Sequence, residues 1–101
     1  MSAGARLLLD RLGLTEAELC EVLDADPLTV ISDELDHRPE LGILLTLTSE
    51  AEDRVGAALL RRWLRTAGPS GRPLDHLLAR DFGAFEHAIT TLAERGFVIG
   101  G

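Results

Sequence analysis

The sequence has no lysine, asparagine, glutamine or tyrosine, and one cysteine among its 101 residues. With Cys20 alone the chain forms no internal disulfide, and a lone cysteine in an apolar pattern indicates a small core residue rather than a nucleophile. Three Phe and one Trp are too few to build a core on aromatics. Because Leu fills 20 positions, we expect the aliphatic core that is usual for helical domains.

Long apolar runs are absent too. The longest mostly apolar stretch, residues 42–47, is far shorter than the roughly 18 residues that a membrane span needs. Asp10 and Arg11 follow the leucines at 7–9 too closely for a signal-peptide core. We therefore expect a cytoplasmic protein that makes no use of a membrane.

Positive charge is scarce in the first half of the chain. The net charge is −7. Residues 1–53 carry 13 acids and three Arg, a balance of −10, whereas residues 54–101 carry four acids and seven Arg, a balance of +3. A nucleic-acid binder usually presents a basic surface on the element that contacts its ligand. The first half of this chain would instead repel phosphate.

Strand-like alternation is lacking, and helical spacing predicts an all-α fold, a compact bundle of about seven short helices. Thr15 and Glu18 have the spacing of a capping box, Asp26 and Asp81 are expected N-caps, and prolines and glycines mark other helix ends. This pattern predicts helices over residues 3–12, from 15 through 23, from 27 to near 37, from 39 through 55, around 59–64, from 73 through 78, and from 82 to the residue before Gly96. Gly56 marks a break, because glycine costs about 1 kcal/mol in a helix interior. We expect one compact domain with two halves, residues 1–56 and 57–101.

Catalytic chemistry has no support in the sequence. Each of the three histidines, His37, His76 and His87, lies next to an acid. Neighbouring helical residues point about 100° apart, so these pairs are not ready-made dyads. Metal-binding, nucleophile and phosphate-loop spacings are missing. We expect no enzyme, no metal and no cofactor, with the histidines on the surface.

Residues 15–37 have the spacing of a helix-turn-helix pair with a turn near Ala25. We expect the apolar side chains of its second helix to face inward, namely Leu28, Ile31 and Leu35. The face that would contact DNA bases then consists of Thr29, Val30, Asp33 and Glu34. Its two carboxylates have no neighbouring cation to supply the phosphate attraction that dominates DNA affinity. A transcriptional regulator that binds DNA as a dimer is therefore the alternative hypothesis, disfavoured by charge.

Two further features admit a functional or a neutral interpretation. Arg61, Arg62 and Arg65 either form a solvated surface that pairs with the acidic first half, or contact an acidic partner or a nucleotide. After the last helix, Gly96 is expected to end it in a left-handed conformation, with Phe97 folding back onto Leu92 or Ala93. The apolar tail of residues 98–101 then either frays or docks on a partner.

Two sets of residues resemble bacterial antitoxins of the MbcA/ParS/Xre type, and the match spans nearly the whole chain. Residues 11–19 (RLGLTEAEL) and 22–27 (VLDADP) are similar to the degenerate Xre-like half of these proteins. Their toxin-binding half is matched by Trp63 and Leu64, residues 71–78 (GRPLDHLL), Phe85 and residues 93–98 (AERGFV). The pattern is one of spacing and a handful of residues.

The resemblance implies a partner, a toxin of the RES class that consumes NAD. In this family the C-terminal helix and tail contact the toxin and obstruct its active site. Carried over, the residues at or behind that interface are Glu86, Ile89, Leu92, Arg95, Gly96, Phe97 and Val98, with Ile99 extending beyond the pattern. The first half of such proteins often binds DNA and represses the protein's own operon. Asp33 and Glu34 depart from that DNA-binding pattern. We also expect a homo-oligomer, on general grounds for small helical regulators.

Overall fold

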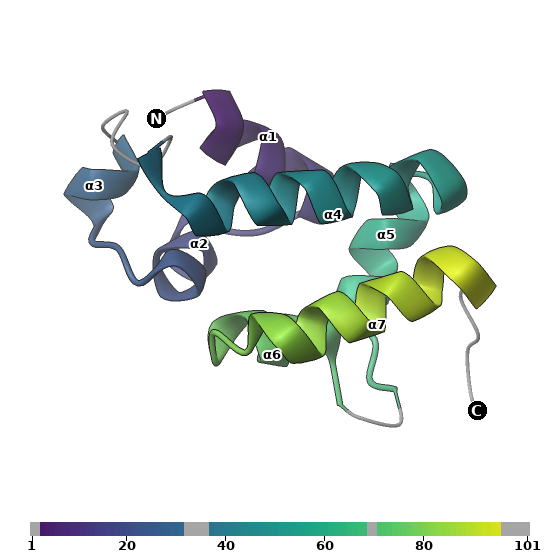
Figure 1. The fold of residues 1–101 in the computed structure, drawn as a ribbon. Helices are drawn as coiled ribbons and strands as arrows, with labels where there is room; N and C mark the ends of the chain where they lie inside the picture. Colours follow the sequence, from purple (N-terminus) through teal and green to yellow (C-terminus); the bar gives the residue numbers. More distant parts are fainter. Residues whose placement is uncertain (1–2, 32–36, 69–70, 96–101) are drawn as a thin grey trace.

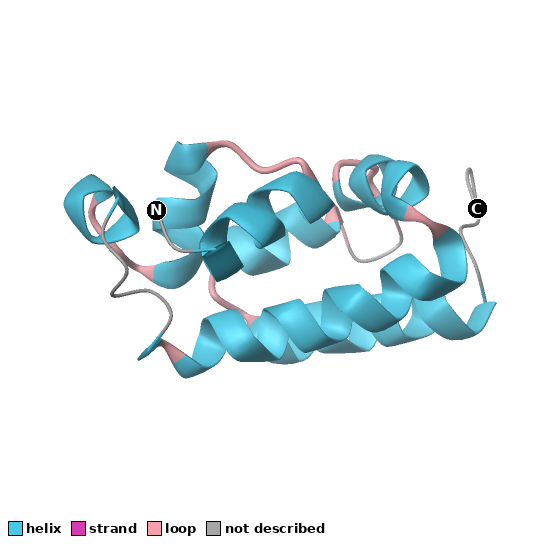
Figure 2. Ribbon diagram, turned by 90° about the horizontal axis from the view of Figure 1, so that it is seen from above, coloured by secondary structure: helices cyan, strands magenta, loops and turns pink. Residues whose placement is uncertain are grey.

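Seven α-helices account for most of the residues that the computed structural model describes, which are 3–31, 37–68 and 71–95. Among these residues there are only helices and loops, with no strand (Figure 2). The helices are α1 (Ala3–Leu12), α2 (Glu16–Leu23), α3 (Pro27–Ile31), α4 (Pro39–Val55), α5 (Ala57–Leu64), α6 (Pro73–Leu78) and α7 (Phe82–Arg95). The predicted all-α fold is therefore confirmed. The predicted extension of α3 through residues 32–36 lies outside the described residues.

Local capping explains where the helices begin. Before α2, Thr15 Oγ1 accepts a hydrogen bond from Glu18 N at 3.1 Å, and Thr15 N donates to Glu18 Oε1 at 2.9 Å, which is the predicted capping box. Asp26 Oδ1 accepts from Thr29 N at 2.8 Å before α3, and Asp81 Oδ1 accepts from Ala84 N at 3.2 Å before α7. These carboxylates satisfy helix N–H groups that have no partner inside the helix.

One glycine separates the longest helix from the next. Gly56 has φ of 88°, in the left-handed range that a side chain disfavours, and its N–H donates to Glu52 O at 2.8 Å. Its own carbonyl accepts from Leu60 N at 3.1 Å and so belongs to the start of α5. The predicted break at Gly56 is confirmed, and it turns the chain from α4 into α5.

The core lies around α4, which packs against α1 on one side and α7 on the other (Figure 1). Twelve of the 17 buried hydrophobic residues in the described ranges are Leu, and Phe85 is the one aromatic among them, so the core is aliphatic as expected. Contacts of α1 with α5 and of α2 with α6 join residues 1–56 to residues 57–101 in one core. In Figure 1, α3 and the last turn of α7 lie at opposite ends of the molecule.

A buried polar link joins α1 to α4. Arg11 Nη1 donates to Leu45 O at 2.9 Å and to Thr48 Oγ1 at 3.0 Å. The Thr48 hydroxyl donates in turn to Leu44 O at 2.7 Å. Arg11 Nε has no hydrogen bond among the described residues, but Glu52 Oε2 lies 3.5 Å away and balances its charge as an ion pair. The side chain of Arg11 is only 10% exposed, and two hydrogen bonds from Nη1 and the ion pair at Nε offset part of the cost of burying its charge.

One expectation about the core is wrong. Leu28, predicted to face inward, is 78% exposed. The physical reason is that α3 packs mainly against α2, so no third element covers the side of α3 on which Leu28 lies. The side chains of Ile31 and Leu35 lie outside what the structure describes.

Candidate functional site

The last helix has one buried and one exposed side. Phe85, Ile89 and Leu92 are at most 2% exposed and anchor α7 on α4 and α6. The Phe85 ring lies 6.0 Å from the Trp63 ring, at an interplanar angle of 53°, which is a favourable tilted contact. The exposed side of α7 carries Glu86, His87, Thr90, Glu94 and Arg95. A rigid helix thus presents a polar surface up to its last turn.

A groove runs between this helix and the second half of α4. Its volume is about 140 Å³, and it is lined by Leu47, Glu50, Arg54, Ile89, Thr90, Ala93 and Glu94. Arg54 Nη1 donates to Ala93 O at 3.4 Å, which ties the end of α4 to the last turns of α7. The residues on the α4 side of this groove were not among the predicted site residues. The signal was the spacing of Leu47, Glu50 and Arg54, which places them on one side of a helix.

The predicted toxin-contact residues that the structure describes lie in two different environments. Glu86 and Arg95 are exposed on α7. Ile89 is 2% exposed and lines the groove. Its side chain therefore packs beneath the exposed residues of α7 and offers little surface to a partner. Four of the predicted contact residues lie outside the described residues, namely Gly96, Phe97, Val98 and Ile99.

Among the described residues of the second half that carry the antitoxin resemblance, the apolar ones pack together, whereas Gly71, Arg72 and Asp75 are exposed. Leu64, Pro73, Leu74 and Leu77 are buried, and Trp63 is half-buried against Phe85. Arg72 Nη2 donates to Asp75 Oδ1 at 2.8 Å and lowers the pKa of that carboxyl, which lies in the first turn of α6. The apolar side chains of α5 and α6 lie beneath α7.

No protein-family model, curated protein or solved structure matches this chain. What the protein does is therefore inferred from its own residues and from the resemblance to antitoxins. Three other predicted features remain, namely the cluster of Arg61, Arg62 and Arg65, the outer face of α3, and the three histidines.

Two of the three clustered arginines are bound to the first half of the chain. Arg65 makes a two-pronged pair with Glu18, with Nη2 to Oε1 at 2.7 Å and Nη1 to Oε2 at 3.1 Å, and Nη2 also donates to Gly13 O at 2.8 Å. The hydrogen bonds from Arg65 lower the pKa of the Glu18 carboxyl. Arg61 Nε donates to Asp10 O at 2.7 Å. Arg62 is exposed, and its guanidinium has no hydrogen bond or ion pair within the described part of the chain.

On α3, the described part of the face that would contact DNA is engaged in capping. Both the backbone N and the Oγ1 of Thr29 donate to Asp26 Oδ1, at 2.8 and 2.9 Å. The backbone hydrogen bond from Thr29 lowers the pKa of Asp26, so this end of α3 carries a carboxylate at neutral pH. The side chain of Val30, together with Asp33 and Glu34, lies outside what the structure describes.

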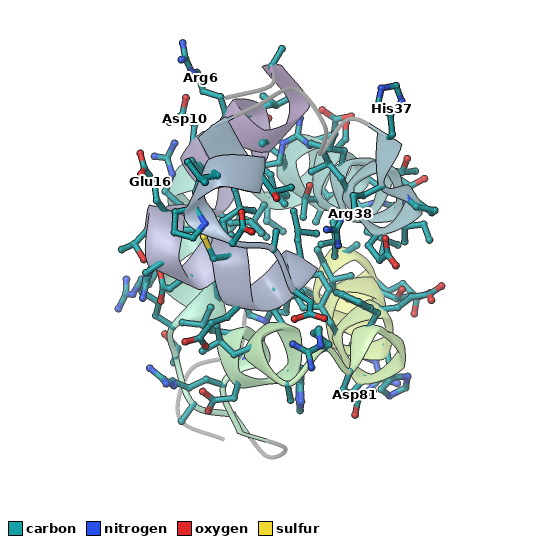
Figure 3. The ribbon with its side chains drawn as sticks, turned by 90° about the vertical axis from the view of Figure 1, so that its left-hand side faces the viewer. Arg6, Asp10, Glu16, His37, Arg38 and Asp81 are labelled. Atoms are coloured by element: carbon teal, nitrogen blue, oxygen red, sulfur yellow. The ribbon has the colours of Figure 1, made fainter. Side chains whose placement is uncertain are left out.

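The histidines and the cysteine lie apart from one another. His37 precedes α4 and points outward (Figure 3), His76 is half-buried on α6, and His87 is exposed on α7. Across residues 3–31, 37–68 and 71–95, no three His, Cys, Asp or Glu side chains come together as a metal site. Cys20 is half-buried, and burial raises the pKa of its thiol. In the same ranges, no helix has the length and apolar character to cross a membrane.

Proposed function

We propose that this protein is an antitoxin that neutralises a RES-type, NAD-degrading toxin by covering the entrance of its active site. The contact would be made by α7 and residues 96–99. One observation carries the proposal: the residues of the second half that resemble the antitoxin family, including Trp63, Leu74 and Phe85, pack together and hold α7 in place. Packing of this kind beneath α7 would hold the end of the helix in a fixed position for a partner.

A fixed helix end favours inhibition by occlusion. Phe85, Ile89 and Leu92 anchor α7 along its length, and the Arg54 to Ala93 hydrogen bond holds its last turns. A segment that follows an anchored helix end loses less conformational freedom on binding than one that follows a frayed helix. A few buried anchors, Phe97 first among them, would then supply most of the affinity. The mechanism uses no catalytic group and no cofactor of the antitoxin itself.

Net charge supports association with such a toxin but does not set the direction of approach, because residues 54–101 carry a balance of +3. Glu86 and Glu94 on α7 and Glu50 across the groove outnumber the neighbouring Arg54 and Arg95, and the whole chain carries −7. A pocket that binds the pyrophosphate of a dinucleotide needs positive charge. An acidic inhibitor is attracted to such a pocket over a distance of about 10 Å at ordinary salt.

Protection of cells tests the proposal. The chain is co-expressed with the toxin gene adjacent to its own, and growth is measured. Deleting residues 98–101, or the substitution Phe97→Asp, is expected to abolish protection, and circular dichroism of both variants checks that the helices still form. Full protection by both variants would overturn the proposed plug.

Charge reversal tests the helix surface separately. Glu86→Arg combined with Glu94→Arg is expected to weaken protection, because both side chains lie on the exposed side of α7. Glu16→Arg combined with Glu21→Arg, the same change in charge at two exposed positions of α2, is the matched control and should protect like the unchanged chain. Equal loss in both cases would assign the effect to net charge and remove α7 from the interface.

A further inference from the structure

The groove between α4 and α7 has the size of one aromatic ring. Its volume is about 140 Å³, and its apolar lining comes from Leu47, Ile89 and Ala93. A cavity of about 150 Å³ lined by aliphatic and aromatic side chains holds a benzene molecule. The groove therefore fits the ring of one phenylalanine.

One aromatic residue of the chain is left to occupy this groove. The sequence has three Phe and one Trp. Phe85 belongs to the core, and Trp63 and Phe82 pack against it. The fourth aromatic residue is Phe97, which lies outside the described residues and follows the end of α7 by two positions. The occupant that fits by size is thus next to the groove in the sequence.

Phe97 is also within reach of the groove. The helices α4 and α7 lie side by side and run in the same direction (Figure 1), and the groove extends along α7 to Ala93 and Glu94 in its last turn. A glycine in the left-handed conformation, as the sequence predicts for Gly96, turns the chain back over the last turn of a helix. The groove lies at that turn, so residue 97 needs no longer connection to enter it.

We propose that residues 96–99 of the free chain fold back along α7 and that the Phe97 ring occupies the groove between Leu47, Ile89 and Ala93. The ring then covers the half-buried Leu47 and Ala93 and loses its own contact with water, which is favourable for apolar surface. Because the segment is tethered to α7, it meets the groove at an effective concentration of about 1 mM or more.

The charges that line the groove do not oppose this occupant. They are Glu50, Arg54 and Glu94, and the Arg54 guanidinium donates to Ala93 O at 3.4 Å. Residues 96–101 have no charged side chain, so docking brings no charged side chain against a like charge. A separate molecule lacks the advantage of the tether, and a second copy of the chain carries −7. The chain's own Phe97 is therefore the favoured occupant.

Docking gives Phe97 two alternative positions. Under the proposed function the same ring is the main anchor on the toxin, so the free chain keeps it covered and the toxin has to displace it from the groove. The apparent affinity for the toxin is then reduced by the fraction of chains in which the ring is docked. This consequence rests on the antitoxin proposal, whereas the docking itself does not.

NMR of the full chain tests the docking without any toxin. With Phe97 assigned, nuclear Overhauser effects are expected between its ring and the methyl groups of Leu47 and Ile89. The contact of Trp63 with Phe85 is the internal control. A mixture of labelled and unlabelled chains should show the Phe97 contacts only within one chain. Their absence, or contacts between chains in the mixture, would overturn the proposal.

A variant that fills the groove tests the same contact by proteolysis. Ala93→Leu extends a larger side chain into the groove and should expose Phe97, so chymotrypsin should cleave after Phe97 about threefold faster or more than in the unchanged chain. Ala17→Leu, the same change at an exposed position of α2, is the matched control and should be cleaved there at the unchanged rate. Circular dichroism checks that both variants fold. Equal cleavage rates in all three folded chains would contradict the docking.

Discussion

Truncation of Phe85 to alanine is expected to remove the strongest anchor of α7. The ring is fully buried and lies 6.0 Å from the Trp63 ring in tilted geometry. Phe→Ala at such a site costs about 3–5 kcal/mol, including the lost ring contact and the cavity left behind. Since domains of this size are stable by about 5–15 kcal/mol, the variant should lose a large share of its stability, and it unfolds if the unchanged chain lies at the low end of that range.

Urea denaturation followed by far-UV circular dichroism and by tryptophan fluorescence measures this loss. Trp63 is the only tryptophan, so its emission reports directly on the contact with Phe85. Phe82→Ala is the control, because Phe82 is half-buried at the start of α7 and should cost about 1–2 kcal/mol. A loss below about 1 kcal/mol for Phe85→Ala, or a larger loss for Phe82→Ala, would refute the assignment of Phe85 as the anchor.

Substitutions at four other positions follow from local geometry. Gly13→Ala should destabilise by about 1 kcal/mol or more, since φ is 65° and the new Cβ would lie 3.3 Å from an arginine side chain. Gly42→Ala lies in the interior of α4 with open space around the new Cβ, so it should raise the free energy of unfolding by about 0.5–1 kcal/mol. Denaturation curves at low micromolar concentration measure both variants. A change of the same sign for Gly13→Ala and Gly42→Ala would contradict this reasoning. Thr48→Val should cost about 1–2 kcal/mol in the same assay because it breaks a buried hydrogen-bond network, and Thr48→Ser should cost less. Arg65 lowers the pKa of Glu18 below 4.5, so the pair's contribution to the free energy of unfolding is full above pH 4.5 and is lost as the pH falls through the lowered pKa. Glu18→Gln should therefore be less stable than the unchanged chain by under about 1 kcal/mol at neutral pH and equal to it in acid, and a gap that persists in acid would contradict the ion pair.

Helix boundaries were predictable because their causes are local. The capping box of Thr15 and Glu18, the cap at Asp81 and the break at Gly56 each depend on a few neighbouring residues, and the structure has all three. The aliphatic core was predictable for the same reason, since Leu at helical spacing leaves little choice of which side faces inward.

Features that depend on which helices meet could not be predicted. Leu28 has the spacing of a buried residue, yet its exposure is decided by whether another element covers α3. The groove beside α7 depends on the pairing of α7 with α4, which brings Glu50 and Arg54 to residues some 40 positions away in the sequence. Periodicity identifies the sides of a helix, but the partner of each side is set by the tertiary packing.

The account's central claim is that α7 and the residues after it close a toxin's active site. The most direct measurement is NAD consumption by a purified RES-type toxin while this chain is titrated in. We predict that activity falls to zero at a fixed molar ratio with the unchanged chain and stays high with Phe97→Asp. NAD consumption that is unaffected by the unchanged chain, or blocked equally by the variant, would contradict the account.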